Sequence, residues 1–415
     1  MERRLFSKDF TLVVIGQVIS LFGNAAVRFA LPLYLLNLTG SSALYGTVTA
    51  CAFIPAVLMS PVGGIVADRV NKRNIMVLLD FFTAAVIFAF SMLMDRGGIV
   101  LPVTVTMMLL YGIAGAYQPS VQASIPALVG QEHFMAANSV INIVNSFASL
   151  TGPVLSGILY SAYGLRPVLE VCVVCFVLSA VMEIFIHIPF QRQEPGGGIL
   201  RTVKADFGES IRFIKEEKPV IGKVVVIVCG INLFLSAMLI VGLPYLVTEV
   251  LDLGGAQANR LYGYAEGALA AGGLLGGIGA GVFAGRLKVQ KAGNLLISCA
   301  ACVFPMAASL ALSLPGMANY IVITLCCFVI MVFSTVFTVQ MMSYIQAETP
   351  QSIIGKVIAV ILTVGMCAQP LGNALYGVLF EMCMGFEYAA VLFSGIVSLA
   401  IALGTRNVFR DKNLY

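Results

Sequence analysis

Runs of about 20 apolar residues, separated by short polar segments, repeat along this chain. A run of this length is typical of a helix that crosses the hydrocarbon core of a bilayer. Twelve such spans can be drawn, at residues 11–36, 44–67, 74–94, 100–120, 135–160, 167–188, 220–247, 260–284, 292–314, 319–342, 353–380 and 387–406. The pattern therefore predicts an all-α integral membrane protein.

Composition supports this prediction. Of the 415 residues, 59% are hydrophobic and 11% are charged, and the mean hydropathy is +0.97. A water-soluble fold could not bury so much apolar surface. The first ten residues, "MERRLFSKDF", carry the charge of a signal peptide, but no cleavage site follows, so we expect the first span to be kept.

The long segment 189–219 lies between spans six and seven and divides the chain into two halves. We therefore expect a six-helix bundle at 1–188, a cytoplasmic linker at 189–219 and a second bundle at 220–415. In the linker, Val203, Phe207, Ile211 and Ile214 recur at helical spacing opposite charged residues. This pattern indicates an amphipathic helix, which either lies on the membrane surface or packs on protein.

The basic residues predict the orientation. Most of the 24 Lys and Arg residues lie at the termini or between spans two and three, six and seven, eight and nine, or ten and eleven. The other side holds Arg96, Arg166 and Arg260. Because cytoplasmic segments are enriched in Lys and Arg, we expect both termini in the cytoplasm and the chain in the cell membrane.

A charged stretch after span two has a weaker copy after span eight. The first reads "GGIVADRVNKR" (63–73) and the second "AGVFAGRLKVQK" (280–291). At an offset of 217 residues, Gly64, Ala67 and Arg69 fall on Gly281, Ala284 and Arg286, and Pro153 falls on Pro370. The shared offset predicts that the two halves are internal repeats, as is common in secondary transporters.

These features resemble the major facilitator superfamily. The loop motif of that family stands here as Gly64, Asp68, Arg69, Lys72 and Arg73, with Asn71 where a glycine is usual. The resemblance implies two pseudo-symmetric bundles of six transmembrane helices that rock about a central site. It also implies that the motif is a conformational latch, in which Asp68 meets the helix that begins near Ser352 and Ile353.

Three further segments resemble bacterial exporters of drugs, macrolides and siderophores within that family. They are "GQVISLFGNAAVRFALPLYLLNLTGSS" in span one, "IPALVGQEHFMAANS" after span four and "GPVLSG" in span five. The helix-packing residues Gly152, Pro153 and Gly157 resemble a motif of antiporters, although Ser156-Gly157 stands one residue later than the usual pair of glycines. The resemblance implies antiport and export of a bulky amphipathic compound.

Four ionisable residues stand out inside the predicted spans, because a charge at the helix centre costs roughly 2.5–3.5 kcal/mol. They are Arg28, Asp80, Glu183 and Glu266. Arg28 and Glu266 have similar depths, so an ion pair between them is allowed, and both are candidates for proton coupling. Asp80 is a third candidate and could pair with the basic loop nearby. Glu183, near the inner end of span six, is expected to face water.

Polar and aromatic residues could line a substrate cavity, because the family places spans one, four, seven and ten at the centre. For each of them a helix-to-helix hydrogen bond is an equal alternative. The candidates are Asn24, Tyr111, Tyr117, Gln118, Asn232, Phe234, Phe337 and Gln340, joined by Asn142 and Asn145 on span five and by Gln369 and Asn373 on span eleven.

The sequence carries no signature of ATP hydrolysis, of a nucleophilic triad or of a zinc enzyme. The pairs Cys172/Cys175 and Cys299/Cys302 lie inside spans without His or acidic partners, which indicates packing rather than a metal. We expect a monomer without cofactor or nucleic acid that exchanges a small molecule against protons by alternating access. The alternatives are an importer or uniporter of a metabolite, a non-transporting receptor or scaffold, and a membrane enzyme.

Overall fold

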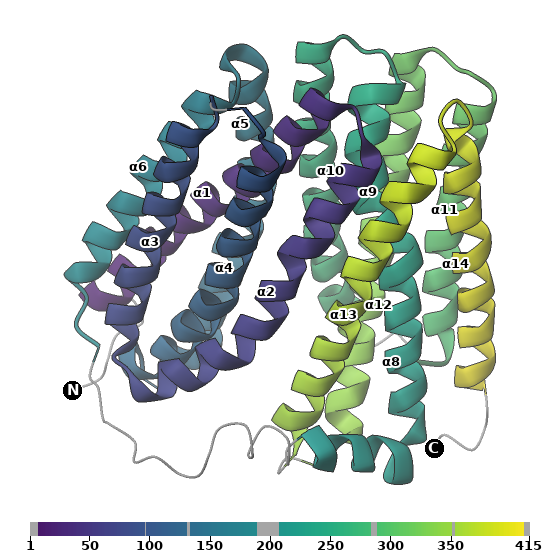
Figure 1. The fold of residues 1–415 in the computed structure, drawn as a ribbon. Coiled ribbons are helices and arrows are strands. Elements are labelled where there is room, and N and C mark those ends of the chain that lie inside the picture. Colours follow the sequence, from purple (N-terminus) through teal and green to yellow (C-terminus); the bar gives the residue numbers. More distant parts are fainter. Residues whose placement is uncertain are drawn as a thin grey trace. The chain divides into compact units, whose positions relative to one another are not determined.

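The computed structural model describes residues 7–95, 97–130, 133–188, 207–283, 289–350 and 353–410; at 61, 64–69, 123, 126, 135 and 407–410 it describes the backbone alone. Every regular element in these ranges is a helix, and twelve are long and apolar enough to cross a membrane (Figure 1). The predicted all-α, twelve-span architecture is confirmed. In the first half the helices are α1 (Lys8–Thr39), α2 (Ser42–Arg69), α3 (Lys72–Leu93), α4 (Val100–Leu128), α5 (Phe134–Tyr163) and α6 (Leu165–Ile184).

The seventh span is the least regular of the twelve. It joins α8 (Pro219–Ile231), the π-helical segment η3 (Asn232–Ser236), α9 (Ala237–Tyr245) and a second π-helical segment, η4 (Leu246–Val250). Such π-helical turns are frequent at functional sites. The remaining spans are α10 (Gly255–Val282), α11 (Ala292–Ala311, preceded by the short η6, Val289–Lys291), α12 (Gly316–Glu348), α13 (Ile354–Met382) and α14 (Glu387–Arg410).

By packing, the chain forms two compact units. Unit one holds 1–39, 51–195 and 254–267, and unit two holds 40–50, 196–253 and 268–415. The first turns of α2 therefore pack within unit two, and the first turns of α10 pack within unit one. A division of the chain at the linker would place the start of α2 in the first unit and the start of α10 in the second, whereas by packing each belongs to the other unit.

In unit one, α1 packs on both α5 and α6, and α3 packs on α4 and α6 (Figure 1). Small residues and side-chain hydrogen bonds hold α1 in place. Ser156 donates to the carbonyl oxygen of Ala26 over 3.1 Å, and the Cys172 thiol lies 3.4 Å from that of Gly23. Such bonds between side chain and backbone are typical where helices meet in a membrane.

In unit two, the glycine-rich part of α10 packs closely on α12. A Cβ atom on Gly272 would lie 2.5 Å from the carbonyl oxygen of Phe328, and one on Gly276 would lie 2.5 Å from that of Val332. Only glycine leaves room for the α12 backbone at these positions. On the other side of the unit, α11 packs between α12 and α14, and α13 packs on the seventh span.

Large apolar side chains are exposed along the helices, as a lipid-facing surface requires. Leu78 is 69% exposed on α3 and Leu325 is 61% exposed on α12. In the linker, residues 207–212 are helical and continue into a π-helical turn, η2 (Phe213–Glu217), while Val203 lies outside the described residues. Ile214 is buried against Gly222 of α8, which favours the packing of this helix on protein.

Candidate functional site

A buried polar network lies inside unit one and joins four helices. On α1, Gln17 donates a 2.6 Å hydrogen bond from Nε2 to the Tyr117 hydroxyl of α4. Tyr117 donates over 2.7 Å to Oε1 of Glu183 on α6. Ser20, also on α1, donates over 3.0 Å to Oδ1 of Asp80 on α3. All five side chains are buried, so the network is part of the core of this unit.

One expectation for these carboxyl groups is wrong. Glu183 does not face water but is fully buried, because α6 packs there on both α1 and α3. Asp80, 2% exposed, accepts from Ser20, and no described Lys or Arg side chain forms an ion pair with it, while the side chain of Arg69 in the basic loop lies outside the described residues. A buried carboxyl group without a cation is unusual, because its charged form pays a large desolvation cost.

Arg28 lies over the ring of Tyr111, with its guanidinium carbon 3.5 Å from the ring centroid. Tyr111 in turn meets Phe53 edge to face, with the ring centroids 5.3 Å apart. A guanidinium stacked on an aromatic face keeps its charge at modest cost inside a partly buried site. Arg28 therefore has a partner within unit one, and it is an aromatic ring.

Glu266 lies half-buried on the part of α10 that belongs to unit one. Tyr262, one turn earlier on the same helix, is within hydrogen-bonding reach of its carboxyl group and stacks on Phe29 of α1 at 4.8 Å. Among the described residues no ion pair joins Glu266 to Arg28. The predicted ion pair between these two candidates is therefore not formed in this structure.

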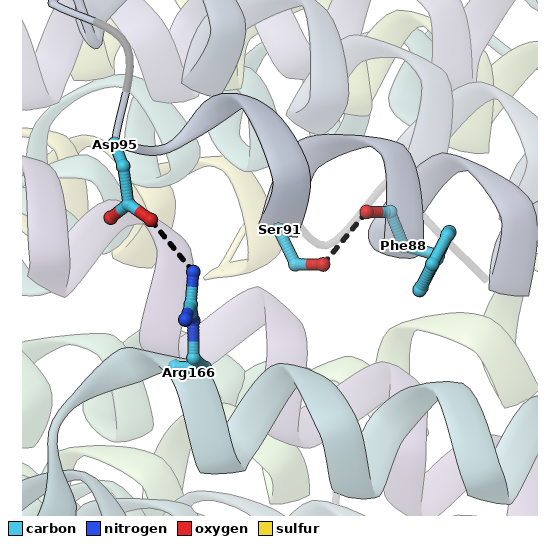
Figure 2. Close-up of polar contacts among 4 residues, drawn as sticks. All are labelled: Phe88, Ser91, Asp95 and Arg166. Carbon is cyan, nitrogen blue, oxygen red and sulfur yellow. Dashed lines mark hydrogen bonds and ion pairs between the residues drawn. The ribbon is translucent and has the colours of Figure 1, made fainter.

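An ion pair lies at an exposed end of unit one. Arg166, at the start of α6, reaches Oδ2 of Asp95 over 2.7 Å. Figure 2 shows this pair together with Ser91, whose hydroxyl donates to the carbonyl oxygen of Phe88. The Arg166 and Asp95 side chains are more than half exposed. Exposed pairs of this kind contribute at most about 1 kcal/mol, so this pair is peripheral.

Unit two contains a largely apolar cavity of about 210 Å³ between α8, α12 and α13. Two of the predicted cavity residues, Asn232 and Phe337, line it together. Asn232 opens the π-helical segment η3 and donates from Nδ2 to the carbonyl oxygen of Gly365 over 3.0 Å. The other lining residues are Val224, Val228, Thr338, Met341, Met342, Ile345, Ile361, Leu362, Gly365 and Met366. Flexible Met side chains suit a surface that accommodates more than one apolar ligand.

Three other predicted cavity residues of unit two contact neighbouring side chains, and a fourth, Gln340, is buried without a hydrogen-bond partner among the described residues. Gln369 donates from Nε2 to Oδ1 of Asn373 over 3.0 Å, and both are buried on α13. Phe234 meets Phe393 of α14 edge to face, with centroids 6.1 Å apart. Gln340 is buried on α12, and its amide has no hydrogen-bond partner within the described part of the chain.

In unit one, Asn24 and Gln118 are half-buried. On α5, Asn142 is exposed and Asn145 bonds locally, from Nδ2 to the carbonyl oxygen of Ile141 over 3.0 Å. Within unit one, neither Asn142 nor Asn145 thus joins the buried network of Gln17, Tyr117 and Glu183.

The glycines of "GPVLSG" lie at two close helix contacts within unit one. Gly152 packs on Ala25 of α1, where a Cβ atom would lie 3.4 Å from the carbonyl carbon. A Cβ atom on Gly157 would lie 3.0 Å from Cα of Gly263 on α10, and the Pro153 carbonyl oxygen faces the same Gly263. These residues let α5 approach α1 and α10 closely.

The charged loop after α2 is described only in part. The backbone is helical up to Arg69, but the surroundings of Gly64 and the side chains of Asp68 and Arg69 are not described, and Ser352 lies outside the described residues. Asn71 caps α3, because its Oδ1 accepts from the backbone N–H of Arg73 over 3.0 Å. The asparagine that replaces the usual glycine thus has a structural role at the helix start.

Residues 13–373 match the Major Facilitator Superfamily. The chain belongs to this superfamily. It is therefore a multi-pass membrane transporter of small molecules rather than an enzyme. The superfamily match covers all the helices that carry the sites above except the first five residues of α1, the end of α13 and α14.

Individual relatives are distant but similar over the full length. Macrolide efflux protein A of Streptococcus pyogenes is 23% identical over 412 residues, which cover 95% of this chain and 94% of that protein. The crystal structure of nucleoside transporter NupG has a TM-score of 0.76 at 14% identity, over 98% of this chain and 100% of that one. A bacterial homologue of the iron transporter ferroportin, in an inward-facing state, has a TM-score of 0.71 at 17% identity, over 95% and 98%.

Sequence reasoning missed Gln17 and Ser20 of the buried network. The available signal was the placement of Asp80 and Glu183 at similar depth on two spans near the same membrane face. A search for uncharged donors at that depth on the first span would have found both residues. It also missed the methionines of the unit-two cavity, because Met on an apolar helix gives no pattern of its own.

Proposed function

We propose that this superfamily member exports a bulky amphipathic compound, such as a macrolide or another drug, or a siderophore, in exchange for protons. The supporting observation is the full-length likeness to a macrolide efflux protein, at 23% identity. The Met-lined cavity beside Asn232 and Phe337, of about 210 Å³, has room for only part of such a ligand, to which it offers apolar contacts and one amide. The transport cycle is alternating access between two bundles, at 1–188 and 220–415, joined by the linker at 189–219.

The coupling ion is a proton because carboxyl groups lie inside the spans, at Asp80 and Glu266. The described residues contain no group of three His, Cys, Asp or Glu side chains that could hold a metal ion. The protein acts as a monomer in the cell membrane, with both termini in the cytoplasm and no nucleic-acid partner. Asp68, with Gly64, Arg69, Lys72 and Arg73, acts as the conformational latch.

Reconstituted vesicles with an imposed pH gradient test this proposal. The probes are erythromycin, the cationic dye ethidium and the hydroxamate siderophore ferrichrome, each followed with the gradient in either direction and without it. We expect at least one probe to move against its own gradient when protons move the opposite way. Transport that does not depend on the pH gradient would indicate a uniporter. Movement of the probe in the same direction as the protons would indicate an importer.

A latch variant separates cycling from binding. Asp68→Asn should slow transport of the probe while its binding affinity stays unchanged. Lost binding in a well-folded variant would contradict the role of the latch.

A further inference from the structure

The buried network of unit one supplies fewer donors than its carboxyl oxygens can accept. Tyr117 and Ser20 each give their one hydroxyl proton to a carboxyl oxygen, Oε1 of Glu183 and Oδ1 of Asp80. Oδ2 of Asp80 and Oε2 of Glu183 are buried and have no hydrogen-bond partner among the described residues. A buried acceptor without a donor costs about 1–3 kcal/mol, and more when it is charged.

The groups that face the pair from the neighbouring helices are neutral. They are Gln17 and Ser20 on α1, Tyr117 on α4 and Ser179 on α6. The hydroxyl of Ser179 lies beside Asp80 and donates to the carbonyl oxygen of Gly16 over 3.1 Å. Within the described residues no Lys, Arg or His forms an ion pair with either carboxyl group. Tyr117 is the other titratable side chain of the network.

One bound proton lowers the cost of burying the two carboxyl groups. Bound to a carboxyl oxygen, it lowers the charge of the pair from two to one and turns that oxygen into an O–H donor. Two carboxyl groups that share a site poor in water commonly hold one proton between them for this reason.

We propose that Asp80 and Glu183 together bind one exchangeable proton and form the coupling-proton site of this transporter. The assignment rests on the proposed proton-coupled function. The proton forms an O–H bond with one carboxylate and leaves as a hydrated proton, with no other bond made or broken. Glu183 lies one residue before the end of α6 at Ile184, so the path to water at that end is short.

The same helix that contacts the pair carries the other polar candidates. Gln17, Ser20, Asn24 and Arg28 follow one another on α1 at steps of three or four residues, which places them along one face. α1 therefore carries Ser20, which contacts Asp80, and Arg28 on the same face.

Infrared difference spectroscopy of the purified protein tests the site without any substrate. The C=O stretching band of protonated carboxyl groups is followed through a pH titration, for wild type, Asp80→Asn, Glu183→Gln and the control Glu170→Gln, an exposed residue of the same helix. We expect a titrating band in wild type and in the control, and its loss or a clear shift in both pair variants. Size-exclusion chromatography and thermal unfolding confirm that each variant is folded. A band that is identical in all four proteins overturns the proposal.

Vesicle transport then separates this site from the proposed function. If wild type shows proton-driven movement of a probe and both pair variants retain it unchanged, the function stands and the pair is not the coupling site. If the variants bind the probe but lose the pH dependence of its movement, the pair is the site. If wild type moves none of the probes while the infrared band depends on the pair, the proton site stands and the proposed substrate class fails.

Discussion

Glu381 caps the first turn of α2 from another helix. Its Oε2 accepts a 3.0 Å hydrogen bond from the backbone N–H of Ala43 and a 2.8 Å bond from the hydroxyl of Ser41. All three residues belong to unit two. A carboxylate at a helix N-terminus accepts hydrogen bonds from free N–H groups and is attracted to the positive end of the helix dipole.

Removal of this cap should destabilise the protein. Glu381→Ala should cost about 0.5–1 kcal/mol, the lower part of the range for an N-cap because the site is exposed. Glu381→Gln keeps an acceptor oxygen without the charge and should cost less. Thermal unfolding in detergent, followed by circular dichroism, measures the order of the three proteins. Equal melting temperatures for wild type and Glu381→Ala would show that the cap contributes nothing.

The contact between α10 and α12 requires glycine at one face of α10 and not at the other. Gly272→Ala should destabilise by about 1–3 kcal/mol, because the added methyl group meets the backbone of Phe328. Gly277→Ala on the same helix meets nothing within 4 Å and should be neutral, or stabilising by up to about 1 kcal/mol through helix propensity. The apparent melting temperature should therefore fall in Gly272→Ala alone. A similar loss in both variants would mean that the close approach of α12 to Gly272 does not set the effect.

The hydroxyl of Tyr117 supplies the donor for Glu183. Tyr117→Phe should lower stability by about 1–3 kcal/mol, because it leaves a buried carboxyl oxygen and the Gln17 amide without their partner. Tyr163→Phe removes a hydroxyl from a side chain that is 73% exposed and should have no measurable effect. Urea or thermal unfolding in detergent compares the two. If Tyr117→Phe unfolds at the same urea concentration or temperature as wild type, the hydrogen bonds of Tyr117 do not stabilise the protein.

A single substitution on α13 can fill the Met-lined cavity of unit two. Met366→Trp places a larger ring in the cavity and should reduce transport of an accepted probe about tenfold or more. Met382→Trp makes the same exchange on the same helix at a position that is 79% exposed and should leave transport unchanged. Initial rates in vesicles measure both. Unaltered transport in Met366→Trp would place the substrate elsewhere.

The stacking of Arg28 on Tyr111 should be visible as an energetic coupling. In a double-mutant cycle with Arg28→Gln and Tyr111→Leu, the two losses of stability should overlap by about 0.5–2 kcal/mol. Arg28→Lys should lose part of the coupling, because a compact ammonium group cannot stack as a planar guanidinium does. Strictly additive losses would mean that the contact carries no energy.

The helices were predictable from the sequence because the bilayer imposes a length and an apolar composition on every span. Polar residues past the hydrocarbon layer carry no such constraint, so α4 runs on to Leu128 and α12 to Glu348, beyond the predicted ends. In contrast, α6 ends at Ile184, because the backbone turns at Phe185, before the predicted end at 188. The twelve spans and the charged motif around Gly64 and Asp68 were sufficient to predict the superfamily.

The site depended on tertiary structure. Glu183, near the end of its span, gives no sequence sign that α1 and α3 cover it, so a position expected to face water proved to be in the core. Gln17 and Ser20 are ordinary polar residues until the packing of α1 on its neighbours brings them to two carboxyl groups. A span is set by the local hydrophobicity of consecutive residues, which the sequence displays. A buried network is set by which helix faces meet, which is decided only when the helices pack.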